Sequence, residues 1–123
     1  MRSDRRIRLG RRGETIAIDA LTQQGYQIVE RNWYCPVGEV DVVARQGNIW
    51  YFFEVRTRRG SAFGNPEESL TTAKQQRMIK VALTYLEAHD VNPYAVDWRV
   101  GLVAVEMDRQ GHLKRLEVYD SIT

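Results

Sequence analysis

The 123-residue sequence lacks the features that mark membrane, secreted or disulfide-stabilised proteins. Its only cysteine is Cys35, so neither an intrachain disulfide nor a cysteine-based zinc site can form. No apolar run reaches the roughly 18 residues that a membrane helix needs. The basic residues 1–6 are not followed by the apolar segment of a secretory signal. We therefore expect a cytoplasmic protein that has no membrane partner.

The sequence also lacks several common catalytic patterns. We find no P-loop, no dinucleotide-binding fingerprint and no Ser-His-Asp arrangement, and no internal repeat or linker. With 43% hydrophobic and 28% charged residues, the composition is typical of a globular domain. The length predicts a single domain over residues 1–123, in which residues 1–8 could form a flexible basic N-terminus.

The net charge of +2 is distributed unevenly. Residues 1–60 carry 11 Lys and Arg against 7 Asp and Glu, whereas residues 61–123 carry 7 against 9. A cluster of arginines near the N-terminus suits contacts with phosphate groups. A solvated, partly frayed terminus explains the cluster equally well. The cluster consists of Arg2, Arg5, Arg6, Arg8, Arg11 and Arg12.

Hydrophobic periodicity predicts two helices and five strands. One helix is expected over residues 5–24, and a second begins at residue 67 or 69 and ends at residue 89. The third strand, the second helix and the fourth strand would form a βαβ crossover, which implies one parallel pair in an otherwise antiparallel sheet. The predicted class is α/β, with a mixed central sheet in αβββαββ order. The strands are expected over residues 27–34, 39–45, 49–57, 97–107 and 114–119, with a loop over 58–66.

Residues 47–48, Gly-Asn, have the composition of a two-residue hairpin turn with glycine first. Such a turn would place Asp41 directly opposite Glu54. In the same register Glu39 faces Arg56. Opposed side chains share a face and lie about 5 Å apart at Cβ. Two carboxylates would then lie side by side on strands that otherwise look buried, and a shift of one residue in register would separate them.

Adjacent carboxylates in a sheet repel each other, and burial increases the cost. A divalent cation removes this cost. Mg²⁺ is typically held by one or two carboxylates together with waters and substrate phosphates. It can activate a water and stabilise charge on a phosphodiester. The paired carboxylates therefore indicate a metal site of the kind that nucleases use.

Glu14 is a candidate third carboxylate. It shares a helical stripe with Ala17, Ile18 and Leu21, so it should face the sheet. The neighbouring glycines at positions 10 and 13 could let the helix approach closely. A polar residue at the edge of the apolar stripe is the alternative interpretation.

Arg56 lies two residues beyond Glu54 and on the same face of the strand. Its guanidinium could hold the scissile phosphate, or it could form a structural ion pair with Glu39, and the two roles can coexist. Other basic residues are candidates for phosphate contacts, and aromatic residues near loops could stack on bases, although packing is their more usual role. The basic candidates are Arg11, Arg12, Arg58, Arg59, Lys74 and Arg77, and the aromatic ones are Trp33, Tyr34 and Phe63.

Several short motifs occur together with a specific spacing. They are Gly13-Glu14, Gly25-Tyr26, Arg31-Asn32, Gly38-Glu39-Val40-Asp41, Phe53-Glu54-Val55-Arg56-Thr57-Arg58, Phe63-Gly64, and Lys74 with Arg77. In combination they resemble the YraN family of uncharacterised bacterial proteins, over nearly the whole chain. That family is similar in fold to the PD-(D/E)XK nuclease superfamily, which includes archaeal Holliday-junction resolvases and restriction-type endonucleases. The resemblance implies a restriction endonuclease-like core.

The resemblance also implies a metal site for Mg²⁺ or Mn²⁺. Its ligands would be Glu14, Asp41, Glu54 and the main-chain carbonyl of Val55, and all three carboxylates would be catalytic. Arg56 stands where the superfamily has lysine, which is the one departure from its pattern. Lys74 could supply an ammonium group from the second helix instead.

The expected function is a metal-dependent endonuclease that hydrolyses phosphodiester bonds in DNA, including branched DNA. The resembling resolvases act as dimers, which makes a homodimer an expectation. RNA remains open as a substrate. One alternative is a nucleic-acid-binding module that has kept the fold and lost the chemistry, as Arg56 in place of lysine would suggest. A protein-interaction domain is the other alternative, since the net charge is modest.

Overall fold

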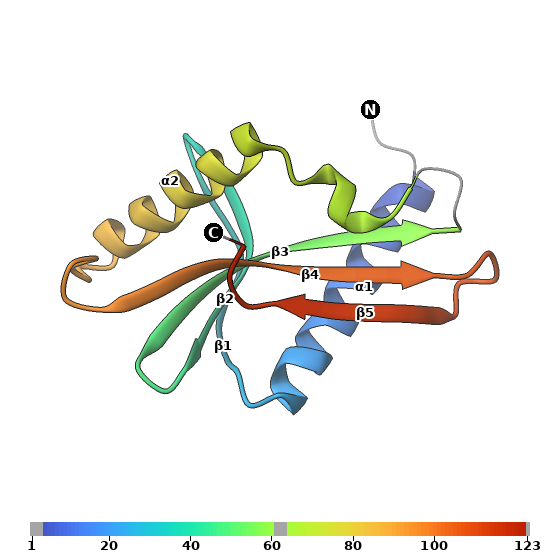
Figure 1. The fold of residues 1–123 in the computed structure, drawn as a ribbon, viewed down its shortest axis with the longest axis horizontal. Helices are drawn as coiled ribbons and strands as arrows, with labels where there is room; N and C mark the ends of the chain where they lie inside the picture. The colour runs from blue at the N-terminus through green and yellow to red at the C-terminus, as the bar shows by residue number, and fades with distance from the viewer. Residues whose placement is uncertain (1–3, 61–63, 123) are drawn as a thin grey trace.

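A computed structural model describes the backbone of residues 4–60 and 64–122 and the side chains of residues 8–60 and 64–122. The mixed α/β fold and the element order are as predicted. The five strands form one sheet in the order β1-β2-β3-β4-β5 (Figure 1). β3 and β4 are parallel, and the other neighbours are antiparallel. The elements are α1 (Asp4–Gln23), β1 (Gln27–Cys35), β2 (Gly38–Gln46), β3 (Ile49–Arg59), the 3₁₀ helix η1 (Pro66–Ser69), α2 (Thr72–Ala88), β4 (Asp97–Met107) and β5 (Leu113–Tyr119).

Two predicted boundaries are wrong. β3 extends to Arg59 because β4 runs beside it that far, so Arg58 and Arg59 lie in a strand and not in a loop. The second helix does not start at residue 67 or 69. Residues 66–69 form η1, and α2 begins only after Thr71, whose side chain caps it by accepting from the Lys74 N–H.

Two other predictions concern parts of the chain that the structure covers incompletely. Of residues 1–8, expected as a possible flexible terminus, residues 4–8 belong to α1 and residues 1–3 lie outside the described part. Phe63, a candidate for base stacking, also lies outside the described residues. Within the described ranges no helix is both long and apolar enough to span a membrane.

The helices cover opposite faces of the sheet (Figure 1), and each face has its own hydrophobic core. Leu21 of α1 packs in one core with Phe53 of β3, and Tyr85 of α2 packs in the other with Phe52. Neighbouring residues of a strand point to opposite faces. The nearly continuous apolar run of β3 therefore reflects cover on both faces, as its sequence predicts.

The β2–β3 hairpin has the register that its turn predicts. Gln46 pairs with Ile49, and the ladder continues in this register to Val42 and Phe53. Gly47 has a φ of 61°, which suits the first central position of a type II′ turn and requires glycine there. This local turn therefore fixes which side chains of β2 and β3 approach each other.

Candidate functional site

β2 and β3 separate just beyond the pair Val42–Phe53. The ladder thus ends one pair before the predicted pair of Asp41 with Glu54 and three pairs before that of Glu39 with Arg56, so neither pair forms in the ladder. Figure 1 shows β2 turning away from β3 toward the β1–β2 hairpin, while β3 continues beside β4. We call this opening the β2–β3 fork and define it by Asp41, Glu54 and Val55.

A local irregularity in β1 and β2 accompanies the fork. Asn32 has a φ of 53°. The β1–β2 ladder pairs Arg31 with Val42 and Trp33 with Val40, but it does not pair Asn32 with Asp41. Val40 and Val42 lie in different cores, although residues two apart on a regular strand share a face. The backbone of β2 therefore twists sharply at Asp41, and the twist opens the fork.

The Asp41 side chain takes over the hydrogen bonding that the ladder loses. Its Oδ2 accepts from the Val55 N–H at 2.8 Å, where an uninterrupted ladder would offer Val40 as the partner. The N–H and C=O of an extended residue point to the same edge of its strand. The Val55 carbonyl is consequently directed toward the fork, which is consistent with the ligand role expected of it.

The pKa of Asp41 is raised to about 7, chiefly by burial and also by the charges of Glu54, Glu39 and Glu14, against the lowering effect of the hydrogen bond from Val55. The charged form of Asp41 is therefore costly in the folded chain. A bound cation would remove that cost.

Glu54 uses one of its two carboxylate oxygens. Oε1 lies 3.0 Å from Nη2 of Arg56 and 2.8 Å from Nζ of Lys74. Oε2 is buried and has no hydrogen-bond partner within the described residues. Burial raises the pKa of Glu54, while Arg56 and Arg77 oppose the rise. A buried carboxylate oxygen without a partner is rare in folded proteins and fits a missing cation.

Arg56 pairs with Glu54 on its own strand, not with Glu39 as one interpretation of the sequence expected. The two paired residues share a face because they lie two positions apart. Glu39 lies opposite Tyr34 on β1, and its charge raises the pKa of the Tyr34 hydroxyl. The Arg56 guanidinium therefore lies beside the acidic centre itself.

The first turns of α2 bring two further cations to the fork. The cap at Thr71 starts the helix so that Lys74 reaches Glu54. Arg77 follows one turn later, and its Cδ would lie 3.5 Å from a Cβ placed on Gly38. The candidates Lys74 and Arg77 are therefore neighbours of the acidic residues. An ammonium group is present at the site although position 56 holds arginine.

Glu14 approaches the fork from the opposite face. Gly13 packs so closely on β3 that a Cβ there would overlap the Thr57 side chain, whereas Gly10 faces open space. The Glu14 side chain is 16% exposed, and its nearest cation is Nη2 of Arg31 at 3.9 Å. Its Oε1 is buried without a hydrogen-bond partner among the described residues. Glu14 is thus a largely buried carboxylate near Asp41 and not a residue at a solvated helix edge.

The three carboxylates have the oxygen ligands that a hard cation prefers, but they do not lie close enough together in this structure to bind one. Among the described residues, no three Asp, Glu, His or Cys side chains converge tightly enough to hold a metal ion. Glu14 and Glu54 nevertheless each bury an oxygen without a partner, and oxygen ligands are what Mg²⁺ and Mn²⁺ prefer. The residues therefore fit such an ion if their side chains draw together around it.

The remaining basic candidates lie away from the fork. Arg58 donates to the Thr57 carbonyl at 3.2 Å, and Arg59 donates to the Arg109 carbonyl in the β4–β5 turn. Arg12 lies near Arg59, and Arg11 is exposed on α1. Sequence reasoning missed Arg31 as the neighbour of Glu14, because only the register of β1 could have indicated it.

Comparison with known proteins identifies relatives over most of the chain. The model of "Uncharacterised protein family UPF0102" matches residues 13–108. A "UPF0102 protein" of Roseiflexus castenholzii is 45% identical over 103 residues, which cover 84% of this chain and 82% of the relative. A "UPF0102 protein" of Moorella thermoacetica is 42% identical over 113 residues, or 92% of each chain. The matched region contains Glu14, Asp41, Glu54 and Arg56.

Proposed function

The chain belongs to the uncharacterised protein family UPF0102, the YraN-like family that its motifs resemble, and we propose that it is a metal-dependent endonuclease acting on DNA. One observation carries the proposal. Glu14 and Glu54 each bury a carboxylate oxygen that has no hydrogen-bond partner among the described residues, both act on Asp41, whose pKa is raised to about 7, and cations of β3 and α2 contact Glu54. Such an arrangement is unfavourable until a metal ion and a phosphate complete it.

The ion would be Mg²⁺ or Mn²⁺, held by Glu14, Asp41, Glu54 and the Val55 carbonyl. When bound, such an ion lowers the pKa of a coordinated water and offsets charge on the phosphodiester. Asp41 is already oriented by its hydrogen bond from Val55 at 2.8 Å. The buried Oε2 of Glu54 is available without breaking the contacts of Oε1.

Arg56 and Lys74 have different roles in this proposal. Arg56 binds the non-bridging oxygens of the scissile phosphate, because a guanidinium stays charged and matches phosphate geometry. Lys74 orients the attacking water or exchanges a proton with it, since an amine can lose its proton and a guanidinium does not. The ammonium group that the superfamily supplies from the third strand thus comes from α2.

DNA is the substrate that this arrangement favours. Arg77 and Arg58 extend the positive charge beyond Arg56 and suit contacts with neighbouring phosphates. A branched DNA substrate and a homodimer are parts of the proposal that rest on the resemblance alone, and RNA remains an alternative substrate. A DNA substrate also suits the cytoplasmic location that the sequence favours.

A second candidate function is a nucleic-acid-binding module without catalysis. The observation in its favour is that Glu54 is already neutralised by Arg56 and Lys74 within the chain. A carboxylate that its own chain neutralises has less need of a metal ion. This candidate predicts salt-dependent DNA binding and no cleavage.

The deciding experiment incubates the protein with linear, flapped and four-way DNA in the presence of Mg²⁺ or Mn²⁺. Cleavage is expected, and Asp41→Asn or Glu54→Gln should abolish it while the protein stays folded by circular dichroism. Glu87→Gln is the matched control, because it removes one exposed carboxylate of α2 outside the fork.

Absence of cleavage by folded protein on every DNA tested would reject the enzymatic proposal. Cleavage that survives both fork substitutions would reject it as well. Binding to DNA without cleavage, weakened by salt, would support the second candidate.

A further inference from the structure

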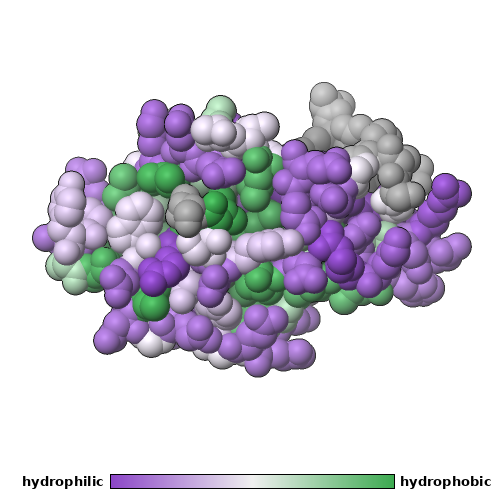
Figure 2. All heavy atoms as spheres, viewed as in Figure 1, coloured by the Kyte–Doolittle hydropathy of each residue, from purple (hydrophilic) through white to green (hydrophobic). Residues whose placement is uncertain are grey.

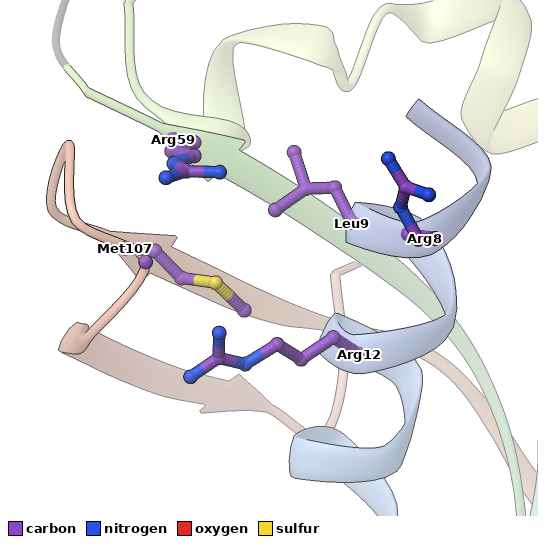
Figure 3. A pocket seen from close by; sticks show the side chains of 6 residues that line it. Arg8, Leu9, Arg12, Arg59 and Met107 are labelled. Carbon is purple, nitrogen blue, oxygen red and sulfur yellow. The ribbon is translucent and has the colours of Figure 1, made fainter. Parts of the chain in front are cut away.

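A second cluster of charge lies at the far end of β3, and its sign is opposite to that of the fork. Here α1, the end of β3 and the β4–β5 turn enclose a pocket of about 170 Å³. Figure 3 shows Arg12 and Arg59 extending into this space from α1 and β3, with Leu9 and Met107 between them and Arg8 at its edge. Figure 2 shows hydrophilic residues covering the neighbouring surface over η1 and the ends of β4 and β5. Gly111 completes the lining.

The Arg59 guanidinium is already fixed in place. Its Nε and Nη2 donate to the Arg109 carbonyl at 3.1 Å and 2.7 Å. These two bonds leave other N–H donors of the guanidinium, which has five in all. An orientation fixed in advance lowers the entropy cost of holding a ligand.

Arg12 and Arg59 carry like charges at close range. A Cβ atom placed on Gly111 would lie 3.1 Å from Nη1 of Arg12 and 3.7 Å from Nη2 of Arg59. The two nitrogens are therefore no farther apart than these two distances added together. Two guanidinium groups this close repel each other unless an anion lies nearby.

No acidic side chain of the described residues neutralises this pair. The ion pairs of arginines there belong to Arg31, Arg56 and Arg115, and the described lining of the pocket contains no Asp or Glu. The pocket therefore holds an excess of positive charge on three exposed arginines, beside the apolar side chains of Leu9 and Met107.

We propose that this pocket binds a phosphate group through Arg12 and Arg59, with Arg8 contributing at its edge. Phosphate fits better than a carboxylate because its several oxygens can accept from two guanidiniums at once. Arginine also matches phosphate in geometry as well as in charge. The site is separate from the acidic residues of the fork.

A nucleic-acid strand is the source of phosphate that the position favours. Arg59 follows Glu54 by five residues of β3, a distance of about 16 Å at 3.3 Å per residue. A nucleic-acid strand rises about 3.4 Å per nucleotide. Because Arg59, unlike Glu54, points to the face that α1 covers, such a strand would reach the fork from the side on which Glu14 lies. This assignment of the source rests on the proposed function, whereas phosphate binding itself does not.

The first test is an NMR titration of ¹⁵N-labelled protein with inorganic phosphate, with chloride added to a matched ionic strength as the reference. Saturable shifts are expected at the Gly111 amide and at the Arg12 and Arg59 side-chain N–H groups. The shifts should disappear in Arg12→Gln and in Arg59→Gln. They should persist in Lys80→Gln, which removes the same charge from an exposed position of α2 outside the pocket. Absence of saturable shifts, or shifts that are retained in Arg12→Gln, would reject the proposed phosphate site.

The second test measures DNA affinity by fluorescence anisotropy over a range of salt concentrations. Arg12→Gln should weaken binding about tenfold, the equivalent of about 1.4 kcal/mol, and should reduce the salt slope by about 1. Lys80→Gln should change neither quantity as much. If phosphate binds but Arg12→Gln does not change DNA affinity, the phosphate site is confirmed and the assignment of that phosphate to a nucleic acid is rejected. Cleavage is not measured in either test, so the pocket and the proposed nuclease activity can fail independently.

Discussion

Two groups of charged residues in this molecule illustrate opposite ways of placing carboxylates in a sheet protein. At the fork, burial and neighbouring carboxylates raise the pKa of Asp41 to about 7. At the other group, Arg115 holds the pKa of Glu67 down at about 2. We call the second group the Glu67 network, formed by Glu67, Glu106, Arg115 and Tyr119. Both carboxylates of the network pair with Arg115, whereas Asp41 at the fork forms no ion pair with the described residues.

The Glu67 network has the geometry of a structural anchor. Arg115 donates to both oxygens of Glu67 at 2.8 Å and to Glu106 at 2.7 Å, and the Tyr119 hydroxyl donates to Glu67 at 2.8 Å. It joins η1 to β4 and β5, next to the break that sets the start of α2. The network therefore stabilises the fold, and it helps to hold Lys74 where it can reach the fork.

The largest expected difference between the two groups is in metal affinity. Glu54→Gln should lower affinity for Mn²⁺ at least about 10-fold, because replacing a ligand costs no less than replacing an outer-shell residue, for which losses of about 10- to 100-fold are typical. Glu67→Gln should leave the affinity unchanged, since its carboxylate is already used by Arg115. Isothermal titration calorimetry would measure both. Equal losses in the two variants would show that the fork is not the metal site.

Stability should respond to Asp41 in the opposite direction from an ordinary paired carboxylate. The pKa of Asp41 in the folded chain lies at about 7, above its ordinary value of 3.8. The folded chain therefore binds a proton more tightly than the unfolded chain, so the free energy of unfolding falls as pH rises from about 4 to 7. Without metal, Asp41→Asn should raise the free energy of unfolding by about 1–3 kcal/mol at pH 8.

Urea denaturation in EDTA at several pH values would measure this effect. The Asn side chain keeps an oxygen that can accept from Val55, so the hydrogen bond of the ladder end is preserved. Asp41→Asn should also flatten the dependence of stability on pH in this window. A variant less stable than the parent at pH 8 would show that the Asp41 charge is compensated in the apo protein.

The Glu67 network should lose stability when it is broken. Arg115→Met should lower the free energy of unfolding by about 1–2 kcal/mol, which allows for partial exposure of a bidentate pair. The pKa of Glu67 is lowered in the folded chain, so its contribution to stability is present above its ordinary pKa of 4.5 and disappears as pH falls toward about 2. Arg11→Met is the control in urea denaturation, because it removes an exposed arginine. Equal losses in both variants would contradict a structural role for the network.

The local features of the fork could be predicted from the sequence. The Gly-Asn turn over residues 47–48 fixed the β2–β3 register, and the ladder observed up to Val42 and Phe53 has that register. Helical spacing placed Glu14 on the stripe that faces the sheet. These predictions succeeded because turn chemistry and periodicity act over a few residues.

The opening of the fork could not be predicted from the same rules. It depends on the left-handed conformation of Asn32 and on a twist of β2 at Asp41, both of which are properties of the assembled sheet. The contact of Lys74 with Glu54 depends on where η1 ends and α2 begins. The pairing of Glu67 with Arg115 joins residues 48 positions apart. No local pattern encodes such contacts, because they follow from tertiary packing.

The smallest expected effect concerns one hydroxyl of the Glu67 network. Tyr119→Phe removes a single hydrogen bond to Glu67 from an exposed side chain, so it should cost only about 0.5 kcal/mol in urea denaturation. It should also raise the pKa of the Glu67 carboxyl, because that bond contributes to the lowering. An NMR titration of the Glu67 carboxyl carbon would detect the change. Arg115→Met should raise this pKa further, since Arg115 is the larger cause. If Tyr119→Phe raised it as much as Arg115→Met, the hydroxyl and not the guanidinium would distinguish Glu67 from the carboxylates of the fork.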